Sequence, residues 1–595
     1  MQDYLKHFLL DSASRFVPFR AWIGDLKNPK ILRADIVAGI TVALVLVPQG
    51  MAYAQLVGLP TYIGLYASFL VPIVAAIFGS SRQLQNGPVA IISLMTAAAL
   101  VPLGLQPEQM IIYAAVLALM AGMIQMVLGF LRLGVLVDFL SHPVVIGFTN
   151  AAALVIASLQ LGHLFGVESP RGDHLIDSLI VLVKAIPSQT HMPTLLMGLF
   201  TLAILIGVKK LTPKLPSMIV AMVLATLASW LLGFEDMGGK VVGHIPKGLP
   251  SFSVPDFELK YLPQLVVPAI LIALLSFVEA FSIAKAVASR TRQRISADQE
   301  MVGKGLANLT AGFMSGYPVS GSFSRTAVAF EAGAKTGFTA IVSGILVGLT
   351  LLFFTPLLYS LPIASLAAVI IMSVIGLLHP QAILRAWKVT KHDGIVAVTV
   401  FLATLWYAPH LEKGIFIGVG MSIVFYIYYT MRPHFAEVSL YHDGSYRDAK
   451  IFGLSTSETV AVFRYDGDLY FANAGYLEKQ ILNTIADKPK LKVVVLDLEA
   501  VAHIDATGEE MLSHLSERIR TAGIDFYIAR AKFMVTDVLK RSGLFDKIGE
   551  DHFFNKRITA IQVLKEKHGD EIDVEPLIIH MPLDKEEEDS PPERP

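Results

Sequence analysis

Long apolar runs separated by short polar segments recur along the chain up to about residue 434 and then stop. A run of about 20 apolar residues is long enough to cross the ~30 Å hydrocarbon core of a bilayer as a helix. Beyond residue 434, charged residues return and short apolar stretches alternate with amphipathic ones, as in a water-soluble fold. The pattern predicts an α-helical integral membrane part followed by a soluble domain.

Fourteen segments of the first part are candidate membrane spans, although the third and the tenth are short and interrupted by Gly and Pro. With a cytoplasmic N-terminus, most Lys and Arg residues of the connecting segments fall in the inner loops, as the positive-inside rule requires. An even number of spans then places both termini in the cytoplasm. The predicted spans are 34–54, 61–79, 87–103, 108–130, 143–166, 194–211, 215–233, 263–289, 298–314, 321–334, 337–360, 362–379, 392–408 and 412–432.

Composition and charge agree with this division. The 595 residues are 54% hydrophobic and 16% charged, and the mean hydropathy of +0.59 is far above that of soluble proteins. Residues 1–434 carry 28 Lys and Arg against 19 Asp and Glu, net +9, and the remainder carries 20 against 30, net −10. Residues 1–33 lack the apolar core of a cleavable signal peptide, so we expect a cytoplasmic N-terminal segment.

The sequence also narrows the chemistry. Without cysteine the chain has no disulfides or thiolate metal sites. A G-x-x-x-x-G-K-[ST] phosphate-binding motif is missing, which argues against pumping driven by nucleotide hydrolysis. We therefore expect no enzyme activity, no metal, no cofactor and no nucleic-acid partner.

Two of the spans are irregular in the same way. The stretches "SSRQLQNGPVAIISLMTA" (80–97) and "SGYPVSGSFSRTAVAFEAG" (315–333) each pass through extended, helix-breaking residues before a helix begins part-way across the membrane. They hold the third place in the first and in the second seven spans, which favours a transporter built from inverted repeats. Two helix N-termini that face each other present free N–H groups and partial positive charge, so the pair predicts an anion site.

Two of the charged residues inside predicted spans are functional candidates. Arg325, in the first turn of the second half-helix, adds a full positive charge to the predicted site, although it could instead extend back to the cytoplasm from an ordinary span. Glu279 lies in the middle of the eighth span and is a candidate coupling or proton-relay group. The alternative for Glu279 is a structural pairing with Lys304 or Lys285.

The stretch "DIVAGITVALVLVPQGMAYAQLVGLPTYIGLYASF" (35–69), with "NGPVAIISLMT" and "SGSFSRTAV", resembles the sulfate permease (SulP) family of anion transporters, and the match covers essentially the whole chain. The resemblance implies a seven-plus-seven inverted repeat, in which a core of spans 1–4 and 8–11 moves against a gate of spans 5–7 and 12–14, and a homodimer. Packing alone is the alternative role for Tyr53 and Phe323. The substrate-binding positions that the resemblance implies are Gln49, Tyr53, Val89, Ala90, Ser93, Ser322, Phe323, Ser324 and Arg325.

The soluble part, with "KVVVLDLEAVAHIDATGEEMLSHLSERIRTAGIDFYIAR" (492–530), has the alternating strand and helix pattern of an α/β domain. It resembles the STAS domain of sulfate transporters and anti-sigma-factor antagonists. Thr507 matches the position that is phosphorylated in those antagonists and is a regulatory candidate, with helix capping as its alternative role. The expected domains are a cytoplasmic segment 1–33, a transporter 34–434, a STAS domain 435–575 and a disordered acidic tail 576–595.

The leading hypothesis is a secondary active transporter of inorganic anions in a bacterial cell membrane, with sulfate as the first substrate and proton coupling. Bicarbonate, chloride or a dicarboxylate as substrate, and sodium as coupling ion, are alternatives. An uncoupled channel or exchanger of the same fold is another. A regulatory membrane protein that acts through its STAS domain without transport is the third hypothesis, and Arg325 with the paired half-helices argues against it.

Overall fold

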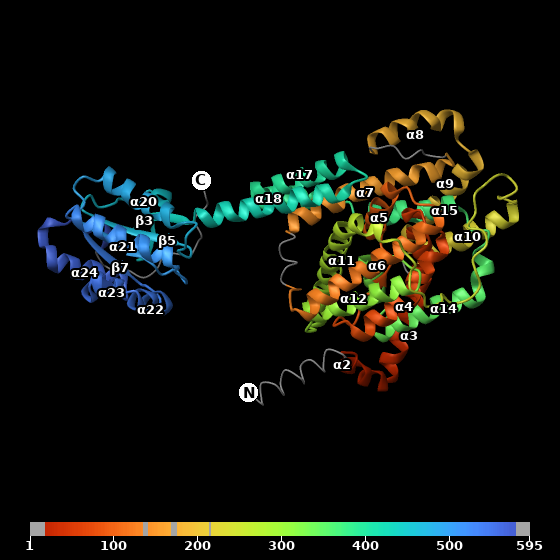
Figure 1. Ribbon diagram of the computed structural model, residues 1–595, viewed down its shortest axis with the longest axis horizontal. Helices are drawn as coiled ribbons and strands as arrows, with labels where there is room; N and C mark the ends of the chain where they lie inside the picture. The colour runs from red at the N-terminus through yellow and green to blue at the C-terminus, as the bar shows by residue number, and fades with distance from the viewer. Residues whose placement is uncertain (1–17, 135–140, 168–174, 213–215, 579–595) are drawn as a thin grey trace. The chain divides into compact units, whose positions relative to one another are not determined.

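The chain forms two compact units, residues 1–423 and 424–595. The computed structural model describes residues 18–134, 141–167, 175–212 and 216–578, so part of the predicted segment 1–33 and most of the predicted tail 576–595 lie outside the described residues. The first unit is helical and the second combines a sheet with helices (Figure 1). Both predicted fold classes are therefore confirmed.

Helices occupy all fourteen segments predicted as membrane spans. Among the described residues, nine helices are long and apolar enough to cross a membrane. Five of the fourteen helices are shorter or less apolar, so the count of fourteen crossings stays a prediction. In chain order the helices are α3 (Pro29–Val57), α4 (Thr61–Phe78), α5 (Ala90–Leu100), α6 (Pro107–Phe130), α7 (His142–Phe165), α9 (Met192–Leu211), α10 (Ser217–Leu232), α11 (Leu262–Thr291), α12 (Ala297–Phe313), α13 (Phe323–Glu331), α14 (Phe338–Leu349), α15 (Ile363–Ile375), α17 (Lys391–Tyr407) and α18 (Leu411–Met431).

Two further helices lie in segments where the span count predicted only loops. They are α8 (Leu175–Gln189), after α7, and α16 (Pro380–Val389), after α15. Each is amphipathic and leaves apolar side chains exposed, such as Val183 of α8 and Leu384 of α16. Exposed apolar faces of this kind suit helices that lie along a membrane surface. The search for long apolar runs missed both helices because only one side of each is apolar.

The helices of the first unit pack in two groups. The first group includes α3, α4, α6, α12 and α14, and the second includes α7, α9, α10, α15 and α17. Within the first group, the buried carboxylate of Asp35 on α3 accepts hydrogen bonds from the backbone and side chain of Thr336 and from the Thr339 hydroxyl, at 2.6–3.1 Å. Asp35 thus joins the beginning of α3 to the beginning of α14.

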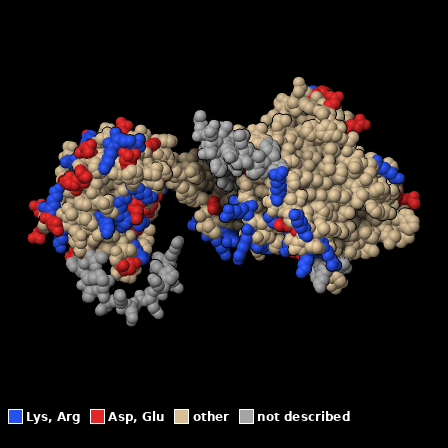
Figure 2. Space-filling view, turned by 90° about the horizontal axis from the view of Figure 1, so that it is seen from below, with Lys and Arg blue, Asp and Glu red and all other residues tan. Residues whose placement is uncertain are grey.

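The surfaces of the two units differ in charge. The helical unit is mostly uncharged, with its Lys and Arg gathered over part of the face shown in Figure 2, whereas both signs of charge are spread over the α/β unit. A surface poor in charge is expected where lipid surrounds the protein, and a mixed one where water does.

The α/β unit contains a six-stranded sheet in the order β4-β3-β5-β6-β7-β8. Strands β5 to β8 are parallel, and β3 and β4 are antiparallel to their neighbours. The strands are β3 (His434–Leu440), β4 (Tyr446–Asp448), β5 (Val460–Asp466), β6 (Val493–Asp497), β7 (Asp525–Ala529) and β8 (Phe553–Phe554). The helices are α19 (Ala449–Phe452), α20 (Ala474–Asp487), α21 (Ala506–Thr521), α22 (Phe533–Arg541), α23 (Leu544–Ile548) and α24 (Arg557–His568).

Alternating side chains of the central strands build a core on each face of this sheet. Phe463 and Leu496 face a cluster that includes Leu512 of α21. Val462 and Val495 face a second cluster, which includes residues of α24. Because each face has its own buried cluster, the unit has the core that an independently folding domain needs.

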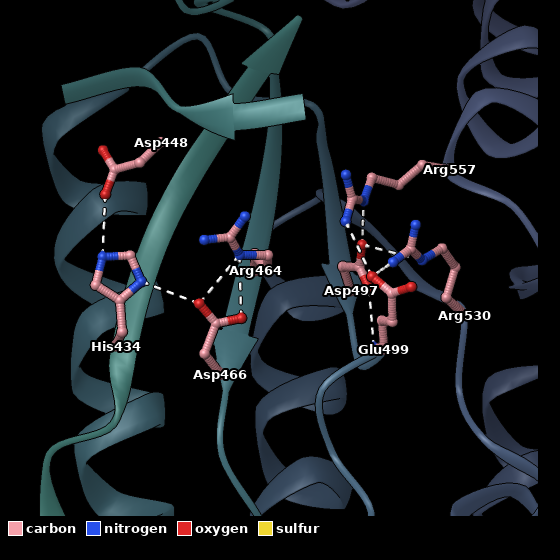
Figure 3. A network of polar contacts seen from close by, with 8 residues as sticks. All are labelled: His434, Asp448, Arg464, Asp466, Asp497, Glu499, Arg530 and Arg557. Atoms are coloured by element: carbon pink, nitrogen blue, oxygen red, sulfur yellow. Dashed lines mark hydrogen bonds and ion pairs between the residues drawn. The ribbon is translucent and has the colours of Figure 1, made fainter. Parts of the chain in front are cut away.

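A charged cluster lies at the carboxyl end of β6 (Figure 3). Asp497 is fully buried and pairs with Arg557, which is itself buried, while Arg530 stands 3.7 Å away from the same carboxylate. Beside it, Asp466 bridges Arg464 and His434 at 3.0–3.1 Å but is partly exposed to water. Loss of one partner is therefore more destabilising at the Asp497–Arg557 pair than at the Asp466 ion pairs, because burial removes the solvation of both charges.

We predict that Asp497→Ala lowers the free energy of unfolding of the α/β domain by about 3–5 kcal/mol, since it removes the buried partner of Arg557 and leaves this arginine the more distant, exposed carboxylate of Glu499, 3.8 Å away. Chemical denaturation of residues 433–578 measures this. Asp466→Ala is the matched control, and we expect it to lower the free energy by about 1 kcal/mol or less because its ion pairs face water. Equal losses in the two variants would contradict the role assigned to burial.

Candidate anion-binding site

Two short extended segments meet inside the helical unit, although they lie far apart in the sequence. Strand β1 (Asn86–Gly87) pairs antiparallel with β2 (Ser320–Gly321). Helix α5 begins three residues after β1, and α13 begins two residues after β2. The two half-helices therefore start from one strand pair, which brings their N-termini, with their free N–H groups and partial positive charge, to a common place.

Arg325 lies in the first turn of α13 and is fully buried. Its backbone N–H donates to the Ser322 hydroxyl at the N-cap, 3.3 Å away, and its Nη1 donates to Gln49 Oε1 at 3.1 Å. Among the described residues, the Nε and Nη2 atoms of Arg325 have no hydrogen-bond partner. A buried guanidinium with two nitrogens left without acceptors is energetically unfavourable, so the arrangement calls for an anion.

Gly87 keeps space for this guanidinium. A Cβ atom at Gly87 would lie 3.3 Å from Arg325 Nη2, and the glycine has a φ of +153°, which side chains rarely adopt. Both the free space and the backbone angle therefore require glycine at this position.

The predicted residues of α3 lie together and are buried. Gln49 receives the hydrogen bond from Arg325, and its Nε2 donates to the sulfur of Met218 on α10, 3.3 Å away. Tyr53, one turn further along α3, is 5% exposed, and its hydroxyl lies near the side chain of Ser373 on α15. Gln49 therefore hydrogen-bonds the Arg325 guanidinium, and Tyr53, four residues later, lies on the same face of α3.

The half-helices contribute residues of differing exposure. On α5, Val89 at the N-cap, Ala90 and Ser93 are buried, and Ser93 donates to the Tyr317 hydroxyl at 3.5 Å. On α13, Ser322 is buried, but Phe323 is 64% exposed and Ser324 is also exposed. The exposure of Phe323 contradicts a packing role in this structure, while the burial of Tyr53 fits either of its two roles.

Glu279 of α11 faces the strand pair. Its Oε2 accepts a hydrogen bond from the Ser320 hydroxyl at 3.2 Å, and Ser320 also donates to the Ser276 carbonyl. Lys304 donates instead to the Asn86 side chain at 3.0 Å, and no ion pair joins it to Glu279 among the described residues. Lys285 lies over the ring of Phe281. Direct pairing of Glu279 with either lysine is therefore not found.

A buried polar network behind β2 was not predicted from the sequence. Asn308 of α12 accepts a hydrogen bond from the Val319 backbone at 2.8 Å and donates to Gln125 of α6 at 2.9 Å. Gln125 in turn donates to Ser276 at 2.8 Å. The network fixes the strand that precedes α13. Its signal in the sequence was present, because Gln125 and Asn308 are polar residues in the middle of predicted spans.

Thr507 belongs to the separate α/β unit. Helix α21 is capped by Asp505, whose side chain accepts from the Gly508 backbone at 2.8 Å, so the capping role considered for Thr507 is wrong. The carboxylate of Asp505 accepts this bond with the geometry typical of an N-cap. Thr507 is the second residue of the helix, and its side chain is exposed.

Comparison of the sequence with known protein families gives two matches. Residues 32–400 match the Sulfate permease family, and residues 454–560 match the STAS domain. The protein named "Sulfate transporter 4.1, chloroplastic" from Arabidopsis thaliana is 34% identical over 574 residues, which cover 93% of this chain and 83% of that protein.

Two solved structures share the fold. That of SLC26A9 superposes with a TM-score of 0.85 at 22% identity and covers 95% of each chain. The transmembrane domain of a cyanobacterium bicarbonate transporter, BicA, gives a TM-score of 0.57 at 23% identity and covers 66% of this chain and 97% of that domain. The family and the relatives are transporters, so the chain is a multi-pass membrane transporter and not an enzyme. It belongs to the sulfate permease family and carries a C-terminal STAS domain.

Proposed function

We propose that the protein is a secondary active transporter of inorganic anions that binds its substrate between the N-termini of α5 and α13. The observation that carries this proposal is the buried guanidinium of Arg325, whose Nε and Nη2 atoms have no hydrogen-bond partner in the part of the chain that the structure describes and lie beside two helix N-termini. Sulfate is the first substrate, since the Arabidopsis relative is named for it. Its four oxygens suit a site that offers a guanidinium fork and the N–H groups of two helices.

The remaining residues complete the proposed site. Gln49 holds the guanidinium, and Tyr53 with Ser93 adds hydroxyl groups from α3 and α5. Val89 and Ala90 are small enough to let an anion approach the N-terminus of α5. Ser322, Phe323 and Ser324 surround the N-terminus of α13, where the exposed Phe323 and Ser324 lie on the approach to the buried Arg325.

Glu279 is the proposed coupling group. Its hydrogen bond to Ser320 links it to β2, the strand that leads into α13. A proton gained or lost at Glu279 therefore acts on the segment that positions Arg325. Proton coupling is the first mechanism to test, with sodium as the alternative ion. An uncoupled exchanger or channel would use the same anion site with Glu279 in a structural role.

Bicarbonate is the second candidate substrate, because the membrane part shares its fold with the bicarbonate transporter BicA. Chloride and dicarboxylates remain within the same chemistry. We further propose a homodimer in a bacterial cell membrane, with both termini and the STAS domain in the cytoplasm. The Nε and Nη2 atoms of Arg325, which have no partner among the described residues, argue against a protein that only regulates through its STAS domain, because such a protein needs no buried anion site.

The function is tested by uptake of labelled sulfate, bicarbonate, chloride and fumarate into proteoliposomes, with and without an inward pH gradient. We expect sulfate uptake that the gradient increases. If only bicarbonate is taken up, bicarbonate and not sulfate is the substrate. Equal uptake with and without the gradient would contradict proton coupling. Failure of all four anions would contradict transport.

We predict that Arg325→Ala lowers anion affinity at least tenfold, because charge-assisted hydrogen bonds contribute about 1.5–3 kcal/mol and 1.4 kcal/mol is tenfold in affinity. The variant should not melt at a lower temperature without anion, since Arg325 makes one side-chain hydrogen bond and carries a buried charge. Arg325→Lys is the matched control and should retain part of the affinity. Unchanged uptake at low anion concentration in Arg325→Ala would place the site elsewhere.

We predict that Glu279→Gln abolishes accumulation driven by a pH gradient but preserves anion binding and exchange at equal pH. Glutamine keeps the size of the side chain and an oxygen for Ser320, yet it cannot cycle a proton. Concentrative uptake and equilibrium exchange are measured in the same proteoliposomes. If the variant still concentrates the anion, Glu279 is structural.

For the STAS domain we predict that Thr507→Glu changes the maximal transport rate and leaves affinity within about twofold. A negative charge in the first turn of α21 favours the helix, so the variant should fold as well as the wild type. Thr507→Val serves as the uncharged control. An unaltered rate in Thr507→Glu would remove the regulatory role.

A further inference from the structure

Gln49 is held between two helices of different packing groups. Its oxygen faces Arg325 of α13, and its nitrogen faces Met218 at the beginning of α10. The orientation of the amide is determined by chemistry, because a guanidinium only donates hydrogen bonds and so must face the oxygen. The Gln49 NH₂ group is thereby directed to the thioether of Met218.

This second contact is the weaker one. A thioether sulfur is a poor hydrogen-bond acceptor compared with oxygen. Gln49 is fully buried, so water does not supply a better acceptor in its place. The charged oxygens of an anion bound at Arg325 would be much stronger acceptors for the same NH₂ group.

Met218 also belongs to the part of the protein that does not carry the site. Helix α10 packs mainly against α9 and less extensively against α3 and α15. Helix α3 packs mainly against α4 and α14, and it also contacts α13 and, across the boundary between the groups, α15. The Gln49–Met218 contact therefore joins the group of helices that holds Arg325 to the other group.

We propose that Met218 is a latch on the anion site: it holds the Gln49 amide until an anion takes that amide over, so that binding removes this contact between α3 and α10. This proposal rests on the proposed anion site at Arg325. Met218 is a positioning residue that acts through Gln49 and competes with the substrate without touching it. A weaker acceptor at position 218 should therefore increase the affinity for the anion, and a stronger acceptor should decrease it.

The test compares Met218→Leu, which has a similar volume and no acceptor, with Met218→Gln, which offers an oxygen. Sulfate affinity is measured by scintillation-proximity binding to the purified full-length protein, and KM and maximal rate are measured in proteoliposomes. We expect about two- to fivefold tighter binding in Met218→Leu and about fivefold weaker binding in Met218→Gln. Met222→Leu, one turn along α10, is the matched control and should bind like the wild type; Met222 is buried and Met218 is half-buried.

Opposite shifts in the two variants support the latch, because a purely packing role would move both in the same direction. In a Gln49→Ala background, both Met218 substitutions should lose their effect on affinity. Shifts in the same direction, or effects that persist without Gln49, would overturn the latch. These outcomes leave the anion site intact, whereas unaltered binding in Arg325→Ala would refute the site itself.

Discussion

The unsatisfied charge of Arg325 is the constraint on which the membrane part depends. Among the described residues its guanidinium meets one side-chain acceptor, Gln49, and a buried charge with so few partners destabilises the fold unless the surrounding structure holds it in place. The scaffold does so with polar contacts from two helices. Helix α12 contacts Val319 through Asn308 and Asn86 through Lys304, and α11 contacts Ser320 through Glu279. These contacts fix the backbone before each half-helix, so the helix N-termini keep their orientation without an anion between them.

The same scaffold explains why Glu279 is more than a counter-charge. It lies within electrostatic reach of both Lys304 and Arg325, yet its hydrogen bond is to Ser320. Glu279 can therefore act on Arg325 in two ways: electrostatically across space, and through its hydrogen bond to β2, the strand that leads into α13. In the proposed mechanism, a change of protonation at this position would alter both the field at the anion site and the contact that holds β2.

Much of this arrangement could be predicted from the sequence. The features that could not be predicted depend on contacts between residues that are distant along the chain. The Gly-Pro and Ser-Gly breaks predicted both half-helices, because helix-breaking residues act locally. The α8 and α16 helices were missed since hydropathy averages over both sides of a helix. Asn308 and Gln125 were visible as polar residues in apolar spans, but their partners, and hence their role behind β2, depend on the fold. The exposure of Phe323 and the contact between Gln49 and Met218 likewise follow from packing between helices distant in sequence.

Binding alone does not move a substrate across a membrane. The strand pair packs against α4 and α11, and the helices that carry Arg325 and Gln49 pack against each other, so an anion bound at the proposed site would stay fixed to one group of helices. Transport requires that occupancy be communicated to the second group, and this needs contacts whose strength differs with and without the anion. In the proposed mechanism Gln49 with Met218 is such a contact, because the Gln49 side chain lies both beside Arg325 and against α10. A weak acceptor is more useful in this place than a strong one, since a tight bond to the second group would compete with the anion and keep the two groups together.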